Sequence, residues 1–458
     1  MLRRAALVVL LTGCAVQPDY ERPALELPDA WQASAPRPAA GEPWWRVYGD
    51  PVLERLVDEA LASNSDVLVA AARVDEARAL LGEARSALRP TVGANASAGR
   101  SRASAATGLL PPGVDRERDN YRATLDVSYE IDIFGRLRAS SEAAAADLAA
   151  SEAVRDAVRL ALTSRVASAY YGLIALDAQV ALTRRVLQLR EASLDLERRR
   201  RSAGLISDFE LRQLEAEAAT LRAQLPPLER ERELAEAALA ALLGRSPRAV
   251  FEEAVARPAS VADAPAPVAV PSGLPSELLL RRPDVVEAEQ RLVAANARVA
   301  VARSAYFPSI RLTGFLGSES AELGDLFTGP AGIWSVAAAL AQPIYAGGRL
   351  EAQREAAAAR ERAALAQYQG AVRNAFREVR QALAAQARAR ESFQAQAERV
   401  AALEETLRLA RLRYTSGVAS QLDVLDAERG LLDAQTARIE ALRAQRAAVA
   451  DLYRALGG

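Results

Sequence analysis

The sequence predicts a mainly α-helical, internally duplicated chain with a small transmembrane β part. Three glycines recur 213 residues later within similar local sequences: Gly135 as Gly348, Gly204 as Gly417, and Gly244 as Gly457. Each half also contains 68 residues without proline and with a single glycine, and short segments with alternating polarity precede them. These observations predict long antiparallel coiled-coil helices that form an α-barrel. The four β-strands per chain would contribute to a trimeric 12-stranded β-barrel.

The chain begins with an apolar run that follows two arginines and leads to Leu11-Thr12-Gly13-Cys14. This layout is typical of a secretory signal, so we expect residues 1–13 to be a signal peptide. The run is much shorter than the roughly 20 residues that span a bilayer as a helix. The segment resembles a bacterial lipobox, in which Cys14 would be acylated. The alternative is a short apolar start with a chance cysteine. We read 14–50 as an extended, Pro-rich arm.

The first repeat covers 51–245. Its predicted elements are a first helix, strands at about 91–101 and 120–132, a long helix at 136–203, and a return helix at 208–243. The long helix would measure about 100 Å. Pro226 and Pro227 stand inside the return helix and should kink or break it.

The second repeat covers 276–458 and follows an irregular linker or equatorial segment at 246–275. Its predicted elements are a first helix, strands at about 309–317 and 332–342, a long helix at 349–416, and a return helix at 420–456. Apolar residues in both long helices recur at steps of four and three, as in Leu162, Val166, Ala169 and Leu173, which is coiled-coil spacing.

Residues 120–132 alternate strictly between apolar and polar side chains. A transmembrane barrel strand and a strand of an ordinary sandwich with one wet face both fit this pattern. In lipid, the backbone N–H and C=O groups at the edges of a four-stranded sheet would have no hydrogen-bond partners. A membrane barrel therefore needs further copies of the chain. Two copies would give a barrel filled by side chains, whereas three would give twelve strands and a lumen.

Composition excludes several classes of function. The formal net charge of −1 gives no reason to expect a nucleic-acid partner. The chain contains no histidine, the most frequent general acid–base residue and metal ligand. We also see no nucleophile–base pair, and we expect no enzyme activity, no metal and no cofactor, apart from a covalent lipid on Cys14.

The chain resembles the TolC-like outer membrane efflux channels, in particular their lipoprotein branch. The motifs are "CAVQPDYERP", "WWRVYGDPVLERLVDEALASNSDV", "GLPSELLLRRPDVVEAEQRLVAANARVAVARSAYFPSI" and "LAQPIYAGGRL". The resemblance implies a passive homotrimeric conduit in the outer membrane, with a tunnel that extends into the periplasm. It also implies a periplasmic adaptor (membrane fusion) protein and a proton-driven inner-membrane efflux pump as partners, and small toxic compounds as cargo.

The resemblance also implies roles for residues at the periplasmic tip. Asp423 and Asp426 would line the pore constriction, and Tyr414 and Glu210 would belong to the network that closes the tip. The best-known type has an arginine two residues after the turn glycine, where this chain has Ala419. The closed state would then depend on hydrophobic packing or on another bond.

An ordinary structural role competes with the pore role at two of these acids. Ser420 and Asp423 have the spacing of a capping box, as do Ser207 and Glu210. Asp426 lies three residues deeper, and its alternative is a surface pair with Arg429. The residues Gly204, Leu205, Ser207, Gly417, Val418 and Ser420 would form the tip turns that dock the adaptor.

Two rival functions remain open in the sequence. One is a type I protein-secretion channel of the same fold, which acylation and the Pro-rich arm disfavour by family analogy. The other is a periplasmic coiled-coil scaffold, which would treat 120–132 as sandwich strands and the lipobox as chance.

Overall fold

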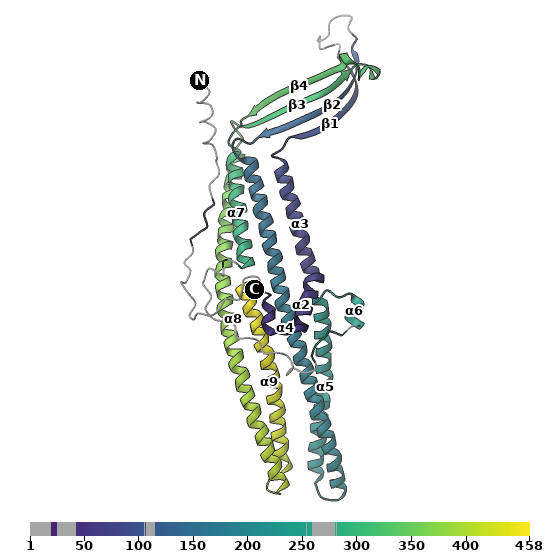
Figure 1. Ribbon diagram of the computed structural model, residues 1–458, viewed down its shortest axis with the longest axis vertical. Helices are drawn as coiled ribbons and strands as arrows, with labels where there is room; N and C mark the ends of the chain where they lie inside the picture. The colour runs from purple at the N-terminus through teal and green to yellow at the C-terminus, as the bar shows by residue number, and fades with distance from the viewer. Residues whose placement is uncertain are drawn as a thin grey trace. The chain divides into compact units, whose positions relative to one another are not determined.

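The two halves of the chain repeat one order of elements, in which a first helical segment leads to two strands, a very long helix and a return helix (Figure 1). The computed structural model describes residues 20–24, 43–104, 106, 115–252, 254–258, 280 and 282–458. The first half contains α2 (Pro51–Ser63), α3 (Ser65–Ser86), β1 (Thr91–Arg102), β2 (Glu117–Ile131), α4 (Arg136–Ser202), α5 (Asp208–Leu242) and α6 (Pro247–Glu252). The second contains α7 (Pro283–Ser304), β3 (Ser309–Ser320), β4 (Gly332–Ala341), α8 (Arg349–Thr415) and α9 (Gln421–Leu456). The predicted signal peptide and Cys14 lie outside the described residues.

The described residues divide into two compact units, and each unit takes parts of both repeats. Unit 1 comprises Met1–Ala24, Arg73–Glu152 and Glu287–Gln369. Unit 2 comprises Leu25–Ala72, Ala153–Val286 and Gly370–Gly458. Because α4 and α8 are 67 residues long, each of them contributes to both units. Contacts between the repeats, and not the repeat boundary, therefore define the units.

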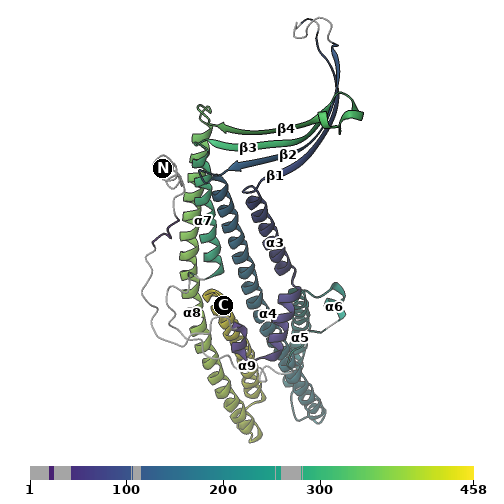
Figure 2. The ribbon, with the colours of Figure 1, turned by 45° about the horizontal axis from the view of Figure 1, so that its top comes forward.

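Unit 1 contains a four-stranded antiparallel sheet in the order β1-β2-β3-β4 (Figure 2). β2 begins three residues before the predicted range, and β3 extends three residues beyond it. Opposite charges explain the extra pairing of β2 with β1, since Arg100 donates to Glu117 at 2.9 Å and Arg102 lies 3.6 Å from the same carboxylate. The predicted strand begins at Asn120, whereas the observed ladder begins at Glu117 and includes these charged cross-strand pairs.

Unit 2 contains most of two helical hairpins, α4–α5 and α8–α9, and a large buried core (Figure 1). The expected extended arm at 14–50 is wrong for its last part, because Trp44–Tyr48 form a short 3₁₀ helix. Trp44 stacks on Tyr453 at 5.5 Å, and its indole Nε1 donates to Thr163. The buried Tyr48 hydroxyl donates to the Arg446 carbonyl oxygen at 2.6 Å. Burial of these rings and bonding of their polar atoms fix the segment to the core.

Two further expectations differ from the structure. Helix α5 forms as one element, close to the predicted bounds 208–243, and does not break at Pro226 and Pro227. Its side chains are buried on both sides of the prolines, for example at Leu221 and Leu239, so packing offsets the lost backbone hydrogen bonds. The linker at 246–275 is not wholly irregular, because it contains the six-residue helix α6.

Gly244, at the end of α5, allows a close approach between two backbones. Its φ is +74°, and a Cβ built there would lie 2.3 Å from the carbonyl oxygen of Ser63. Gly204 has the same φ, but no atom lies within 4 Å of its Cβ position. Positive φ alone costs an alanine about 1 kcal/mol. The clash adds to this cost, so we expect Gly244→Ala to lower the thermal unfolding temperature clearly more than Gly204→Ala. Equal losses would contradict this account.

Candidate functional site

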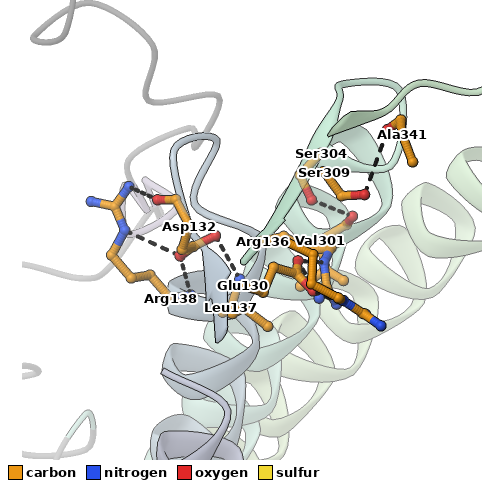
Figure 3. A network of polar contacts seen from close by, with 10 residues as sticks. Glu130, Asp132, Arg136, Leu137, Arg138, Val301, Ser304, Ser309 and Ala341 are labelled. Atoms are coloured by element: carbon orange, nitrogen blue, oxygen red, sulfur yellow. Dashed lines mark hydrogen bonds and ion pairs between the residues drawn. The ribbon is translucent and has the colours of Figure 1, made fainter. Parts of the chain in front are cut away.

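The sheet is joined to α4 by a set of charged contacts that fix where the helix begins (Figure 3). The Asp132 carboxylate accepts from the backbone N–H groups of Leu137 at 3.0 Å and Arg138 at 2.8 Å. Arg136 Nη2 donates to Glu130 at 2.7 Å. Asp132 satisfies free N–H groups at the helix start and adds negative charge there, which favours the helix. The strand therefore passes into the long helix at one defined point.

One face of this sheet is apolar over most of its length. The pairing register aligns Ala94, Leu125, Leu316 and Trp334 in one row across the four strands, and Val92, Val127, Gly314 and Val336 in the next. These side chains remain uncovered by the chain itself, with Trp334 exposed by 74% and Val336 by 80%. Large contiguous apolar surfaces on a folded chain indicate a contact with a membrane or with another protein.

The opposite face of the sheet is polar and internally bonded. Asn95 and Thr124 both donate to the Asp126 carboxylate, at 2.6 and 3.0 Å. Arg122 lies 3.5 Å from Glu319 and its guanidinium stacks over the ring of Phe315. One apolar and one polar face along strands of 10 to 15 residues are typical of a barrel wall with lipid outside and water inside.

Among the described residues, α4 is the helix whose length and apolar composition would allow it to cross a membrane, and 56% of its most apolar window is buried within the protein. The core helix of a soluble protein passes the same test, so length and composition do not distinguish a membrane span from a core helix here. Within the same residues, no group of three acidic, histidine or cysteine side chains is placed to hold a metal ion.

The two hairpins of unit 2 end in turns of the same geometry. Gly204 and Gly417 have φ of +74° and +72°, in the left-handed region that the sequence predicts for turn glycines. In each turn the following residue donates its N–H one turn back, from Leu205 to the Arg200 carbonyl and from Val418 to the Arg413 carbonyl, both at 2.9 Å. This is the usual helix ending at a glycine. It leaves the side chains of Leu205 and Val418 exposed by 69% and 68%.

Asp423 and Glu210 both act as capping residues. Ser420 and Asp423 form a complete capping box at the start of α9, and Ser207 and Glu210 form one at the start of α5. The Ser420 hydroxyl and backbone N–H bond to the carboxylate and lower the pKa of Asp423. The Ser207 N–H and hydroxyl lower the pKa of Glu210 in the same way. Both carboxylates therefore stay charged at neutral pH, whatever further role they have.

Asp426 lies one turn deeper in α9 and is exposed. Its expected surface partner, Arg429, instead pairs with Glu217 of α5. Within the part of the chain that the structure describes, no hydrogen bond or ion pair involves the Asp426 carboxylate. The Asp426 charge adds to the raised pKa of Arg429, but no capping bond explains this acid, and its predicted role at the tip is the hypothesis to test.

Polar contacts join the α4–α5 hairpin to the α8–α9 hairpin along one line, which we call the inter-hairpin seam. Arg190 Nη2 lies 2.7 Å from Glu428, and Arg200 donates to the Tyr414 hydroxyl at 3.1 Å. The remaining seam pairs are Gln179–Glu440 and Glu217–Arg429. A small cluster of Leu194, Leu214, Ala218 and Leu425 packs beside them. The seam therefore contains both kinds of contact that could hold a tip with alanine at 419 closed, namely hydrophobic packing and another polar bond.

Tyr414 lies on this seam. Glu210 bonds to Ser207 in its capping box, and the charge of the seam residue Arg200 adds to the lowering of its pKa. The basic partner of Tyr414 is Arg200 of α4, which also bonds to Glu197 at 3.0 Å. The structure therefore brings Tyr414 to an arginine from the other repeat. Ala419, at the place of the family arginine, is half-buried.

Glu428 is held between two arginines at a cavity of about 650 Å³ along the seam. Arg190, with only 7% of its side chain exposed, binds one carboxylate oxygen, and Arg411 of α8 binds the other at 2.8 Å. Sequence reasoning did not select these residues. The sequence does contain a signal for Arg190. The series of coiled-coil positions that begins at Leu162 continues through Thr183 and Leu187 to Arg190. A charged residue at such a buried step indicates a specific partner.

These features can be compared with known proteins. A model of the outer membrane efflux protein family matches residues 56–245 and 274–458. The chain belongs to the outer membrane efflux protein family. It is 36% identical to the toluene efflux pump outer membrane protein TtgC of Pseudomonas putida, over 100% of this chain and 95% of that protein. It is 34% identical to the probable outer membrane lipoprotein SilC of Salmonella typhimurium, over 98% and 97% of the two chains.

Solved structures agree with this family assignment. The open state of the Neisseria gonorrhoeae MtrE outer membrane channel superposes with a TM-score of 0.85 and 36% identity, over 97% of this chain and 98% of that one. As an outer membrane efflux protein, the chain is a TolC-like protein of the outer membrane, as the sequence motifs predicted. Members of this family serve in efflux, and the apolar face of the sheet is the surface suited to lipid.

Proposed function

We propose that this outer membrane efflux protein is the passive, trimeric channel of a tripartite efflux system. The proposal rests on the two edge strands of its sheet, β1 and β4. In the described residues β1 and β4 each pair on one side only, and lipid cannot satisfy the free backbone groups of a sheet edge. Pairing β1 of one copy with β4 of the next closes a barrel, and three copies give twelve strands around a lumen. The polar face with Asp126 and Arg122 would then line the water-filled interior.

The remaining parts of the system follow from the family. The helical hairpins would form a tunnel in the periplasm, a lipid on Cys14 would anchor the chain, and no cofactor or catalysis would be needed. A periplasmic adaptor would meet the tip turns, and an inner-membrane pump, taken to be proton-driven, would supply the energy. The cargo would be small toxic compounds, a class to which the toluene named for TtgC belongs.

The tip would control passage. In a trimer, three copies of Asp423 and Asp426 would stand near the periplasmic end and form an anionic constriction that favours cations. The inter-hairpin seam would hold the two hairpins of each copy together in the closed state. Opening would separate them, which requires the Arg190–Glu428 and Arg200–Tyr414 contacts to break.

Docking of the adaptor can be tested separately from conduction. Leu205 and Val418 are exposed apolar side chains at equivalent places in the two tip turns. We expect the double substitution Leu205→Asp/Val418→Asp to reduce efflux at least tenfold in susceptibility tests. Conductance in planar bilayers should remain, because the turns keep their glycines. Phe251→Asp, at an exposed site on α6, is the matched control and should leave efflux intact. Normal efflux in the double variant would contradict the docking role.

A further inference from the structure

The two hairpins of the sheet, β1–β2 and β3–β4, repeat one another in pairing register as well as in order (Figure 2). Thr91 pairs with Ser128 in the first hairpin, and Ser309 pairs with Ala341 in the second. Thr91 and Ser309 are 218 positions apart, and Ser128 and Ala341 are 213 positions apart. The same two offsets convert the register of β1 with β2 into that of β3 with β4 at every pair of the second hairpin. Each hairpin is therefore one copy of a repeating unit of the wall.

The joint between the two hairpins, β2 with β3, shows how one unit meets the next. Asp126 stands opposite Phe315 at this joint. A closed wall built from repeating units has an equivalent joint after each unit. β4 is the counterpart of β2, and β1 of a second copy is the counterpart of β3. The two offsets convert the pair Asp126–Phe315 into Ala339 opposite Ser97 of the next copy. We call the pairing obtained in this way the inter-copy register.

The inter-copy register keeps both faces of the sheet continuous from one copy to the next. It places Leu340 opposite Ala96, and each lies an even number of residues from Trp334 or Ala94, so both belong to the apolar face. A slip by one residue would instead place apolar side chains of one copy beside the polar face of the next. The register also places Trp334, which is 74% exposed, opposite Arg102. An arginine beside an indole ring is a favourable contact.

The joint within the chain and the joint between copies differ in charge. On the polar face of β2 and β3, Arg122 lies 3.5 Å from Glu319, and Arg311 lies 3.8 Å from Glu130. The inter-copy register pairs only small, uncharged residues on this face, namely Ser101–Ser335, Gly99–Ala337, Ser97–Ala339 and Asn95–Ala341. Pairing β2 or β3 with an uncharged edge would separate these opposite charges, which is unfavourable. The charges therefore direct β2 and β3 to each other and leave β1 and β4 for other copies.

We propose that β4 of one copy pairs antiparallel with β1 of the next in the inter-copy register, with Ala339 opposite Ser97 and Leu340 opposite Ala96. The partner is a second copy of this chain, because every residue of β1 is exposed and β1 supplies the edge that continues the repeat after β4. Pairing two β1 strands with each other would leave both β4 edges without hydrogen-bond partners in lipid. This inference rests on the proposed function, in which copies of the sheet close a barrel, and it adds which residues meet.

Disulfide cross-linking between introduced cysteines tests the register. The Cα atoms of directly opposite residues lie about 5 Å apart, which a disulfide can bridge. Residues displaced by two positions lie about 7–8 Å apart, which is too far for a disulfide in an unmoved backbone. Within one copy β1 and β4 are three strand spacings apart, about 14 Å, so a bond between them must join two copies. We expect Ala339→Cys/Ser97→Cys to give cross-linked trimers when outer membranes are mildly oxidised and run on a non-reducing gel.

Matched controls move the pair by two residues on the same face. Ala337→Cys/Ser97→Cys and Ala341→Cys/Ser97→Cys should each give about tenfold less cross-linked trimer. Ser128→Cys/Thr313→Cys joins opposite residues within one chain and should form its bond without joining copies. The wild type, whose one cysteine is Cys14, gives the background. Equal or greater cross-linking in either shifted pair would overturn the register.

Co-expression of the single variants Ala339→Cys and Ser97→Cys provides a second measurement, in which each copy changes only one small side chain. Oxidation should give dimers that contain one copy of each variant. An absence of such dimers, while Ser128→Cys/Thr313→Cys still forms its bond, would also overturn the proposal.

Failure of the register is distinguishable from failure of the proposed function. If the wild type conducts in planar bilayers while a shifted pair cross-links best, the register is wrong and the channel stands. If the wild type forms neither trimers nor conducting channels, the channel is rejected and the inter-copy register with it.

Discussion

Glu428→Gln is expected to open the channel tip and to raise single-channel conductance severalfold in planar bilayers. Glu428 joins Arg190 of the first hairpin to Arg411 of the second. The amide keeps the shape of the side chain but leaves the buried Arg190 guanidinium without its counter-charge. Removing one partner of such a pair costs about 3 kcal/mol. This shifts the equilibrium between joined and separated hairpins about a hundredfold toward separation.

Glu405→Gln is the matched control for this expectation. Glu405 pairs with Arg408 on the same face of α8, where both side chains are exposed. An exposed pair within one helix contributes about 0.5 kcal/mol or less, so conductance should stay at the wild-type level. If Glu428→Gln embeds normally and conducts like Glu405→Gln, the seam does not hold the tip closed.

Leu125→Arg is expected to abolish insertion of the protein into the outer membrane. Leu125 lies in the middle of the apolar face, between Ala94 and Leu316 of the neighbouring strands. An arginine that faces lipid near the bilayer midplane costs about 3 kcal/mol for each chain, and a trimer carries the cost three times. Membrane fractionation should then find the variant outside the outer membrane or degraded.

Ser128→Arg is the matched control, because it introduces the same charge on the opposite face of the sheet. Ser128 is on the same strand, three residues along, but on the polar face between Thr91 and Thr313. Because the polar face would line the lumen, this variant should insert normally. Equal amounts of both variants in the outer membrane would show that the apolar face does not meet lipid.

The sequence alone predicted the long helices, the four strands and the turn glycines because each depends on local physics. Absence of proline over 68 residues, strict alternation in 120–132, and glycine at positive φ need no tertiary partner. The charged extension of β2 was missed, and the break offered as one outcome at Pro226 does not occur within the return helix predicted at 208–243. In both cases the deciding contacts come from residues on other strands or helices.

The tip also contains some features that follow from local sequence and others that depend on distant residues. The capping boxes at Ser207 and Ser420 could be read from spacing, because cap and partner are three residues apart. The pairing of Arg190 with Glu428 joins residues more than 200 positions apart, and only the fold brings them together. The pairing of Arg22 with Glu289 is a similar case, because these residues are 267 positions apart and the sequence predicts for the "DYERP" segment only an extended arm. A charged residue at a buried coiled-coil step is a local signal that could have pointed to the seam.

The cation selectivity of single channels tests the account most directly, since it requires a trimeric pore with Asp426 at its constriction. Reversal potentials should be measured under a salt gradient for the wild type, Asp423→Ala, Asp426→Ala and the double variant. We predict that the wild type prefers cations and that Asp426→Ala loses most of this preference. Asp423→Ala should lose less, because part of its role is to cap α9. Unchanged cation preference and conductance in the double variant would contradict the account.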